Sequence, residues 1–125
     1  MRYLLDTNIF LWALNDDPKL KYNIRKVLED PKNEVYISVV NGWEISIKNR
    51  IGKLPLKTKL EECFKKSDFK VLDISLEHIF QLDKLSRYHN DPFDRILIAQ
   101  AKVEGLTLIT SDQKIWKYKL KLIKA

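Results

Sequence analysis

Cysteine, histidine and glycine are scarce in this chain of 125 residues, which holds one cysteine, two histidines and three glycines. The single cysteine, Cys63, excludes a disulfide bond within the chain and favours a reducing, cytoplasmic location. A zinc cage is not expected, because no Cys-x-x-Cys pair occurs and the histidines are limited to His78 and His89. Cys63 falls between Leu60 and Phe64 on an expected helix face, so we interpret it as a small core residue.

Long hydrophobic runs are also missing. The apolar start from Tyr3 to Leu5 is interrupted by Asp6, so no signal peptide is visible. No run approaches the roughly 20 residues that a membrane-spanning helix needs. Hydrophobic residues make up 45% of the chain and charged residues 32%, as in ordinary globular proteins. The length fits a single domain over residues 1–125.

Acidic residues are outnumbered by basic ones, which gives a net charge of +6 and a pI near 9.4. This balance favours an acidic partner such as nucleic acid, an acidic protein segment or a membrane surface. Charge alone does not choose among them, since many basic proteins bind none of these. No acid follows Asp112, and the lysines beyond it alternate with apolar residues between Tyr118 and Leu122. That alternation is typical of an edge strand protected against aggregation.

The chain alternates strand and helix patterns without linkers or repeats. Short strands are expected at residues 2–5, 35–37, 71–72, 107–109 and 118–123. Helices are expected to open at Asp6, at Asp17 with Pro18, at Ser38, at Thr58 in a capping box with Glu61, at Ser75, and at Asp91 with Pro92. The third of these helices ends at Gly52 and the last at Gly105, and residues 111–116 form a turn or short helix. The alternation predicts an α/β fold with parallel strands and right-handed crossovers.

Four acidic residues stand out by their positions: Asp6, Glu44, Asp94 and Asp112. Asp6 directly follows the first strand, and Asp112 follows the strand at residues 107–109. In a parallel sheet, ligands bind at the carboxyl ends of the strands, so both acids belong at that edge. Each has a simpler explanation as a helix cap, for which Thr7, Asn8, Thr110 or Ser111 could substitute.

The other two acids, Glu44 and Asp94, fall inside apolar helical stripes. The apolar neighbours expected on the Glu44 face are Val40, Ile47 and Ile51. Those on the Asp94 face are Leu97, Ile98 and Ala101. Alternatively, Glu44 lies at the rim of its stripe with its carboxylate in water, and Asp94 is a first-turn acid favoured by the helix dipole.

Four converging carboxylates would repel one another, and a bound divalent cation is the usual remedy. Oxygen ligands select hard cations, so Mg²⁺ or Mn²⁺ is expected. Two such ions about 4 Å apart can clamp the attacking and leaving oxygens of an in-line phosphoryl displacement. Together with a basic surface that attracts a polyanion, this predicts a metal-dependent nuclease with Asp6, Glu44, Asp94 and Asp112 as metal-binding and catalytic residues.

Several neighbouring polar residues have two interpretations. Asn8, Lys48, Thr110 and Ser111 are candidate substrate contacts, although caps or a solvated helix face explain them equally well. His89 is more simply a loop histidine satisfied by a cap than a substrate contact. Arg95 is expected to pair with Asp91 or another carboxylate rather than with a phosphate. The tryptophans Trp12, Trp43 and Trp116 are expected to anchor the core or a dimer rather than to stack on bases.

Four segments in order resemble the PIN domain, and in particular the VapC-type toxins of type II toxin–antitoxin systems. They are Leu4-Leu5-Asp6-Thr7-Asn8, the stretch from Ser38 to Lys48 with Glu44, the stretch from His89 to Ala101 with Asp94, and Thr110-Ser111-Asp112. The resemblance spans essentially the whole chain and is most specific at His89-Asn90-Asp91-Pro92-Phe93-Asp94-Arg95. It assigns one acid of the family's metal site to each of the four segments.

The resemblance implies a three-layer α/β/α domain with a central, mainly parallel sheet. It implies Mg²⁺- or Mn²⁺-dependent cleavage of RNA, inhibition by a cognate antitoxin protein, and a homodimer.

Three alternatives stay open. A receiver-like phosphoacceptor domain would need paired acids after the first strand, and only Asp6 is present there. A non-catalytic RNA-binding module would use the acids only as caps. A PIN fold could also serve a regulatory or assembly role without a toxin pairing.

Overall fold

A five-stranded parallel sheet forms the centre of the computed structural model, which describes residues 1–125. The strands are β1 (Arg2–Leu5), β2 (Glu34–Ser38), β3 (Lys70–Leu72), β4 (Thr107–Thr110) and β5 (Leu122–Lys124). Their order in the sheet is β3-β2-β1-β4-β5, and every neighbouring pair is parallel. The chain therefore builds outward from β1 to β3 and then returns to place β4 beside β1. This reversal of direction between β1 and β4 is the point where open α/β sheets bind ligands.

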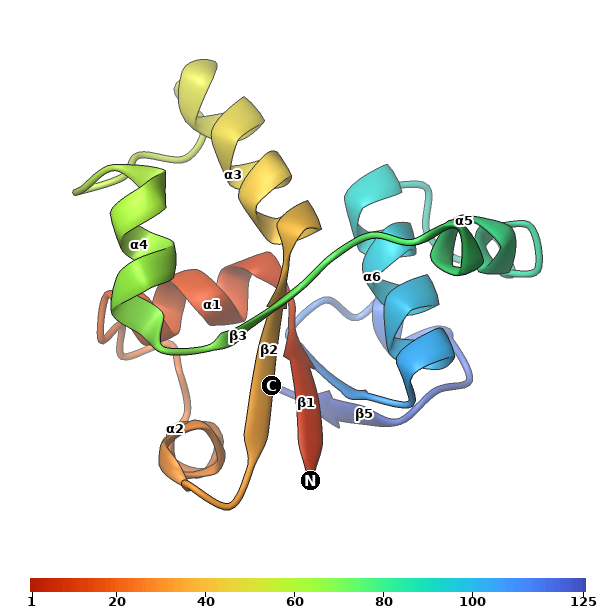
Figure 1. Ribbon diagram of the computed structural model, residues 1–125, viewed down its shortest axis with the longest axis horizontal. Coiled ribbons are helices and arrows are strands. Elements are labelled where there is room, and N and C mark those ends of the chain that lie inside the picture. Colours follow the sequence, from red (N-terminus) through yellow and green to blue (C-terminus); the bar gives the residue numbers. More distant parts are fainter.

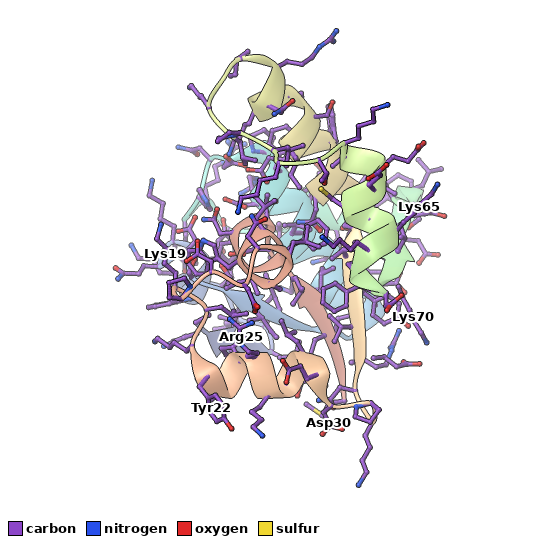
Figure 2. The ribbon with its side chains drawn as sticks, turned by 90° about the vertical axis from the view of Figure 1, so that its left-hand side faces the viewer. Lys19, Tyr22, Arg25, Asp30, Lys65 and Lys70 are labelled. Atoms are coloured by element: carbon purple, nitrogen blue, oxygen red, sulfur yellow. The ribbon has the colours of Figure 1, made fainter.

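Helices cover both faces of the sheet (Figure 1). They are α1 (Thr7–Leu14), α2 (Tyr22–Glu29), α3 (Val39–Arg50), α4 (Leu60–Ser67), α5 (Leu76–Leu82) and α6 (Pro92–Glu104). The side view shows α2 and α4 on one face, with Tyr22 directed outward from α2 (Figure 2). None of the six helices has the length and hydrophobicity needed to cross a lipid bilayer.

The core divides into two clusters because successive strand residues point to opposite faces of the sheet. On β1, Leu4 packs with α6, while its neighbours Tyr3 and Leu5 pack with α1 and α2. Cys63 is buried, as expected. The predicted α/β/α architecture is confirmed.

The helix ends near the functional edge follow the sequence signals. Ser38 caps α3 in a reciprocal capping box with Asn41, and Asp91 caps α6 ahead of Pro92. Gly105 ends α6 with a φ of 67°, a conformation that glycine adopts without steric cost. These local signals fix where α3 and α6 begin, and therefore where Glu44 and Asp94 lie.

Two predicted helix starts are wrong. Asp17 and Pro18 open a tight turn instead of a helix, because the Asp17 carboxylate accepts from the Lys19 N–H and its carbonyl from the Leu20 N–H. Helix α2 begins only after Lys21, without a side-chain cap. The Thr58–Glu61 capping box does not form, since α4 starts after Lys59. Thr58 lies beside the Cys63 sulfur at 3.5 Å instead.

The closing strand is shorter than predicted. The edge position is confirmed, but β5 covers Leu122–Lys124 instead of residues 118–123. Tyr118 is withdrawn from the strand because its ring is buried in the α6 cluster and its hydroxyl bonds to the loop before α6.

The apolar stripe expected around Glu44 is only half buried. Val40 and Glu44 are buried, whereas Ile47, Ile51 and Trp43 are exposed. The reason is the direction of α3, which leads away from the sheet so that its second half has little to pack against (Figure 1). Trp43 lies in the first half of α3 and is 56% exposed, so it is not a core residue either.

Candidate active site

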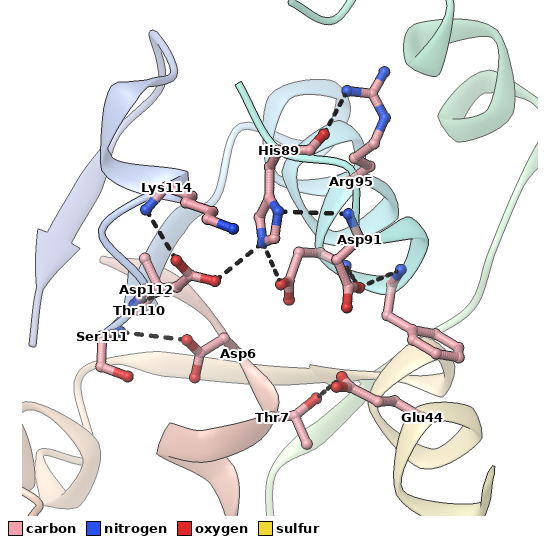
Figure 3. Close-up of polar contacts among 12 residues, drawn as sticks. Asp6, Thr7, Glu44, His89, Asp91, Arg95, Thr110, Ser111, Asp112 and Lys114 are labelled. Atoms are coloured by element: carbon pink, nitrogen blue, oxygen red, sulfur yellow. Dashed lines mark hydrogen bonds and ion pairs between the residues drawn. The ribbon is translucent and has the colours of Figure 1, made fainter. Parts of the chain in front are cut away.

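An open pocket of about 230 Å³ lies at the carboxyl ends of β1 and β4 and has no hydrophobic residue in its wall. Its lining residues are Asp6, Thr7, Asn8, Glu44, Lys48, His89, Asp91, Asp94 and Asp112. All four predicted acids thus line one pocket: Asp6 directly after β1, Glu44 on α3, Asp94 on α6 and Asp112 after β4. Figure 3 shows Asp6, Glu44 and Asp112 around it. The fold brings together residues separated by more than a hundred positions in the sequence.

Asp6 joins the ends of the two central strands. One carboxylate oxygen accepts from the Ile9 N–H at 2.9 Å and caps α1, and the other accepts from the Ser111 N–H at 3.3 Å. Asp6 is only 4% exposed. Burial raises its pKa from 3.8 to about 6, although the Thr110 hydroxyl and the two N–H groups favour the ionised form. Asp6 is both a cap and an acid whose charge is poorly compensated.

Glu44 is buried, so the alternative in which its carboxylate reaches water at a helix rim is wrong. The Thr7 hydroxyl donates to Oε1 at 2.6 Å, and Asn41 donates to that hydroxyl at 3.1 Å. The Lys48 ammonium pairs with Oε2, which raises the pKa of Lys48. This chain of donors fixes the Glu44 carboxylate in the wall of the pocket, between α1 and α3.

His89 bridges two of the predicted acids. Its Nε2 lies 2.7 Å from Asp94 Oδ2 and 3.0 Å from Asp112 Oδ2 (Figure 3). The ring Nδ1 accepts from the Asp91 N–H at 3.4 Å, so in the neutral ring the proton is on Nε2 and is donated to both carboxylates. The expectation of a histidine satisfied only by a cap is wrong. The sequence feature that indicates this bridging role is the position of His89, five residues before Asp94 in the same motif.

Asp94 carries the largest electrostatic cost in the pocket. Its pKa is raised from 3.8 to about 7, first by burial and then by the carboxylates of Asp91 and Glu44, with His89 acting in the opposite direction. Asp91 accepts from the Phe93 and Asp94 N–H groups at 2.9 and 3.0 Å, so it is the cap of α6 as predicted. A cap and a site acid therefore stand side by side, and the charge of Asp91 disfavours the ionised form of Asp94.

The candidate substrate contacts occupy different positions. Asn8 is exposed in the pocket wall, and Lys48 is partly buried beside Glu44. Thr110 is buried, and its hydroxyl accepts from the Asp112 N–H at 3.0 Å. Ser111 faces Asp6 through its backbone N–H. Asn8 and Lys48 are thus available at the pocket surface, whereas Thr110 and Ser111 hold the acids in place.

The loop that carries His89 is held by hydrogen bonds from its backbone to Arg95 and Tyr118. Arg95 donates to the carbonyl oxygens of Ser86 and His89 at 3.0 and 3.2 Å. The predicted pairing of Arg95 with a carboxylate is wrong, because the loop before α6 curls its carbonyl groups around the guanidinium. The Tyr118 hydroxyl accepts from the His89 N–H at 3.1 Å and donates to Ser86 at 2.7 Å.

Replacing Tyr118 with phenylalanine is expected to lower the free energy of unfolding by about 1–3 kcal/mol, because the buried His89 N–H loses its acceptor. Urea denaturation of the variant and the wild type checks this. The matched control is Tyr22→Phe, since Tyr22 is 72% exposed on α2 and should tolerate the loss of its hydroxyl. Equal stability of all three proteins would contradict the role given to the Tyr118 hydroxyl.

The donor set fits a hard divalent cation. Carboxylate oxygens of Asp94 and Asp112 lie within 4.8 Å of each other on either side of the His89 Nε2–H, and Asp6 and Glu44 face the same pocket. The raised pKa values of Asp6 and Asp94 show that the protein supplies too little positive charge for these acids. Carboxylate oxygens in a polar pocket are the ligands that Mg²⁺ and Mn²⁺ prefer.

Comparisons with known proteins agree on the fold. A family model for the PIN domain matches residues 3–120. VapBC2 from Rickettsia felis, bound to a promoter DNA fragment, is 24% identical, with 99% of this chain and 98% of that chain covered and a TM-score of 0.71. VapBC-1 from nontypeable Haemophilus influenzae is 20% identical, with coverage of 99% and 98% and a TM-score of 0.69. FitAcB from Neisseria gonorrhoeae is 18% identical, with coverage of 98% and 96% and a TM-score of 0.65. No curated protein matches the chain.

Proposed function

The chain belongs to the PIN domain family, and from this premise we propose that it is a metal-dependent endoribonuclease, the toxin of a toxin–antitoxin pair. The observation that carries the proposal is the convergence of Asp6, Glu44, Asp94 and Asp112 on one polar pocket. Burial and neighbouring carboxylates raise the pKa values of Asp6 and Asp94, and a bound cation would offset both effects. The net charge of +6 favours a polyanionic substrate.

The four acids would hold one or two Mg²⁺ or Mn²⁺ ions, and the remaining pocket residues would orient them. When bound, the metal supplies an activated water and a Lewis acid at the phosphate. Thr7 and Lys48 fix the two oxygens of Glu44, and the His89 Nε2–H fixes Asp94 and Asp112 relative to each other. Such outer hydrogen bonds orient ligands toward a metal. Asn8 and Lys48 are positioned to contact the substrate at the pocket surface.

A cognate antitoxin is the proposed protein partner. Similar structures that cover nearly the whole chain include a toxin–antitoxin complex from Klebsiella pneumoniae and VapBC-5 from Mycobacterium tuberculosis, a member of the VapBC family of toxin–antitoxin systems. A homodimer is proposed as well, and the exposed apolar side chains of α5, namely Leu76, Ile79 and Phe80, leave surface available for it. Light scattering of the purified protein, alone and with the product of a neighbouring small gene, tests both assemblies.

Replacing Glu44 with glutamine is expected to abolish RNA cleavage while leaving the fold intact, because the amide keeps the size of the side chain but not its charge. The assay is cleavage of a mixed RNA pool by antitoxin-free protein with Mg²⁺ or Mn²⁺, with circular dichroism to monitor folding. The matched control is Glu34→Gln, which removes the same charge from an exposed position on β2 outside the pocket. Full activity of the Glu44 variant would refute its role.

The same assay separates the competing functions. RNA binding that survives chelation, without cleavage by the wild type, would favour a non-catalytic RNA-binding module. The match to the PIN family argues against the receiver-like alternative. Only a stable aspartyl phosphate, formed on treatment with a small phosphodonor, would support that alternative.

A further inference from the structure

The indole of Trp43 is the feature that the proposed chemistry leaves unexplained. It is 56% exposed, although tryptophan is one of the most hydrophobic side chains in the protein. Its ring packs edge-on against Phe93, with centroids 5.1 Å apart and an interplanar angle of 86°. The ring is therefore held by a neighbouring helix while a large part of it faces solvent.

Each member of this aromatic pair is the sequence neighbour of a site acid. Trp43 immediately precedes Glu44 on α3, and Phe93 immediately precedes Asp94 on α6. Both acids line the pocket, whose wall contains no hydrophobic residue. Neither ring lines the pocket, but their contact joins α3 and α6, the two helices that carry Glu44 and Asp94. The pair therefore places an apolar surface beside a pocket that is itself polar and charged.

A nuclease substrate has matching chemistry. Each phosphodiester carries a nucleoside on both sides, so a phosphate in the pocket brings nucleobases to the surface around it. A base has a flat π-face but carries no charge, and it cannot be accommodated among carboxylates as it can on an aromatic ring. Lys48, one turn after Glu44, also lines the pocket and adds a cation to it.

We propose that Trp43, held by Phe93, is a stacking platform for an unpaired nucleobase next to the phosphate that is cleaved, and not the core or dimer anchor expected from the sequence. Because the bases of a duplex already stack on one another, this platform selects single-stranded segments or loops. The inference rests on the proposed nuclease function, since it assumes that a phosphodiester enters the acidic pocket. It assigns to Trp43 a role in substrate selection that is distinct from the chemistry of the acids.

The test is the affinity of a fluorescent single-stranded RNA pool, measured with Ca²⁺ in place of Mg²⁺, beside the same RNA annealed to its complement. Trp43→Ala is expected to weaken single-strand binding by about 5- to 150-fold, the range that base–aromatic stacking provides. Duplex binding is expected to stay unchanged. Trp43→Phe should restore most of the affinity, because phenylalanine also offers an aromatic face.

The control variant is Ile51→Ala, which removes another exposed apolar side chain from the end of the same helix and should bind like the wild type. Equal affinity of Trp43→Ala and wild type for single strands would overturn the proposal. A change in oligomeric state of Trp43→Ala in light scattering, with unchanged RNA affinity, would overturn it in favour of a protein interface. The nuclease function is tested separately by cleavage. If the wild type cleaves RNA but Trp43→Ala binds single strands as tightly as the wild type, only the stacking platform is rejected. Binding that depends on Trp43 without any cleavage would reject only the nuclease.

Discussion

Replacing Asp94 with asparagine will reduce RNA cleavage by at least about a hundredfold and will make the metal-free protein more stable at pH 8. The loss of activity follows from the position of Asp94 among the ligand atoms near His89 and Asp112. Removing even an outer-shell partner of a metal site typically costs 10–100-fold in affinity or activity, so a ligand should cost at least as much.

The gain in stability has a separate electrostatic cause. With a pKa of about 7, Asp94 is ionised at pH 8 against the effects of burial and of Asp91 and Glu44. Asparagine has no charge and keeps an oxygen that accepts from the His89 Nε2–H. Since one pKa unit corresponds to about 1.4 kcal/mol, a gain of about 2 kcal/mol is expected after allowance for partial exposure.

Two measurements check this pair of effects: cleavage rates with Mg²⁺ or Mn²⁺, and thermal unfolding at pH 8 with a chelator present. Asp83→Asn is the matched control, because Asp83 is exposed at the end of α5 and lies outside the pocket. If the Asp94 variant cleaves RNA at the wild-type rate, Asp94 is not part of the catalytic site. A variant that is less stable than wild type would show that the carboxylate is compensated in the native protein.

The metal-free protein is also expected to lose stability, by several kcal/mol in total, as the pH rises from about 4 to about 7. The pKa values of Asp6 and Asp94 are about 6 and about 7 in the folded chain, against 3.8 ordinarily. Between these limits the folded state binds more protons than the unfolded state, so the free energy of unfolding falls with rising pH and levels off above 7. Glu34 acts in the opposite direction, because Lys70 lowers its pKa, but its effect lies below pH 4.5.

Mn²⁺ should reverse this loss, since it binds the ionised carboxylates and therefore stabilises the folded state at neutral and alkaline pH. The experiment is urea denaturation across this pH range without metal, followed by isothermal titration of Mn²⁺ into the antitoxin-free protein. An Asp6→Asn/Asp94→Asn double variant is expected to show a flatter pH profile and no Mn²⁺ binding. Equal Mn²⁺ binding by the double variant and the wild type would mean that these acids do not form the metal site.

Local sequence signals account for much of the fold. The capping box at Ser38, the Asp91–Pro92 start of α6 and the glycine at its end are interactions within a few residues, so the sequence alone was enough to locate them. The two helix starts that were predicted wrongly were also local: at Asp17 a turn uses the same backbone groups, and beyond Thr58 helix α4 starts after Lys59 without a side-chain cap. A capping residue indicates that a backbone N–H is satisfied nearby, but it does not decide whether a helix follows.

The partners of the pocket residues could not be read from sequence. Thr7 meets Glu44 across 37 positions, and Ser111 meets Asp6 across 105. These contacts arise because the parallel sheet places β4 beside β1 and the start of α3 beside that of α1. The bridging role of His89 and the exposure of Trp43 depend on the same packing, which no local pattern encodes.

The sequence by itself determined the class of the fold, the order of its elements and the four acids that reach the pocket, because periodicity, caps and position after a strand are properties of short segments. Only the tertiary structure decided which charges are compensated. The pKa of Asp94 depends on its burial and on Asp91 and Glu44, and Glu44 comes from another helix. Desolvation and Coulomb interactions depend on distances in space, and those distances exist only once the sheet and its helices have assembled.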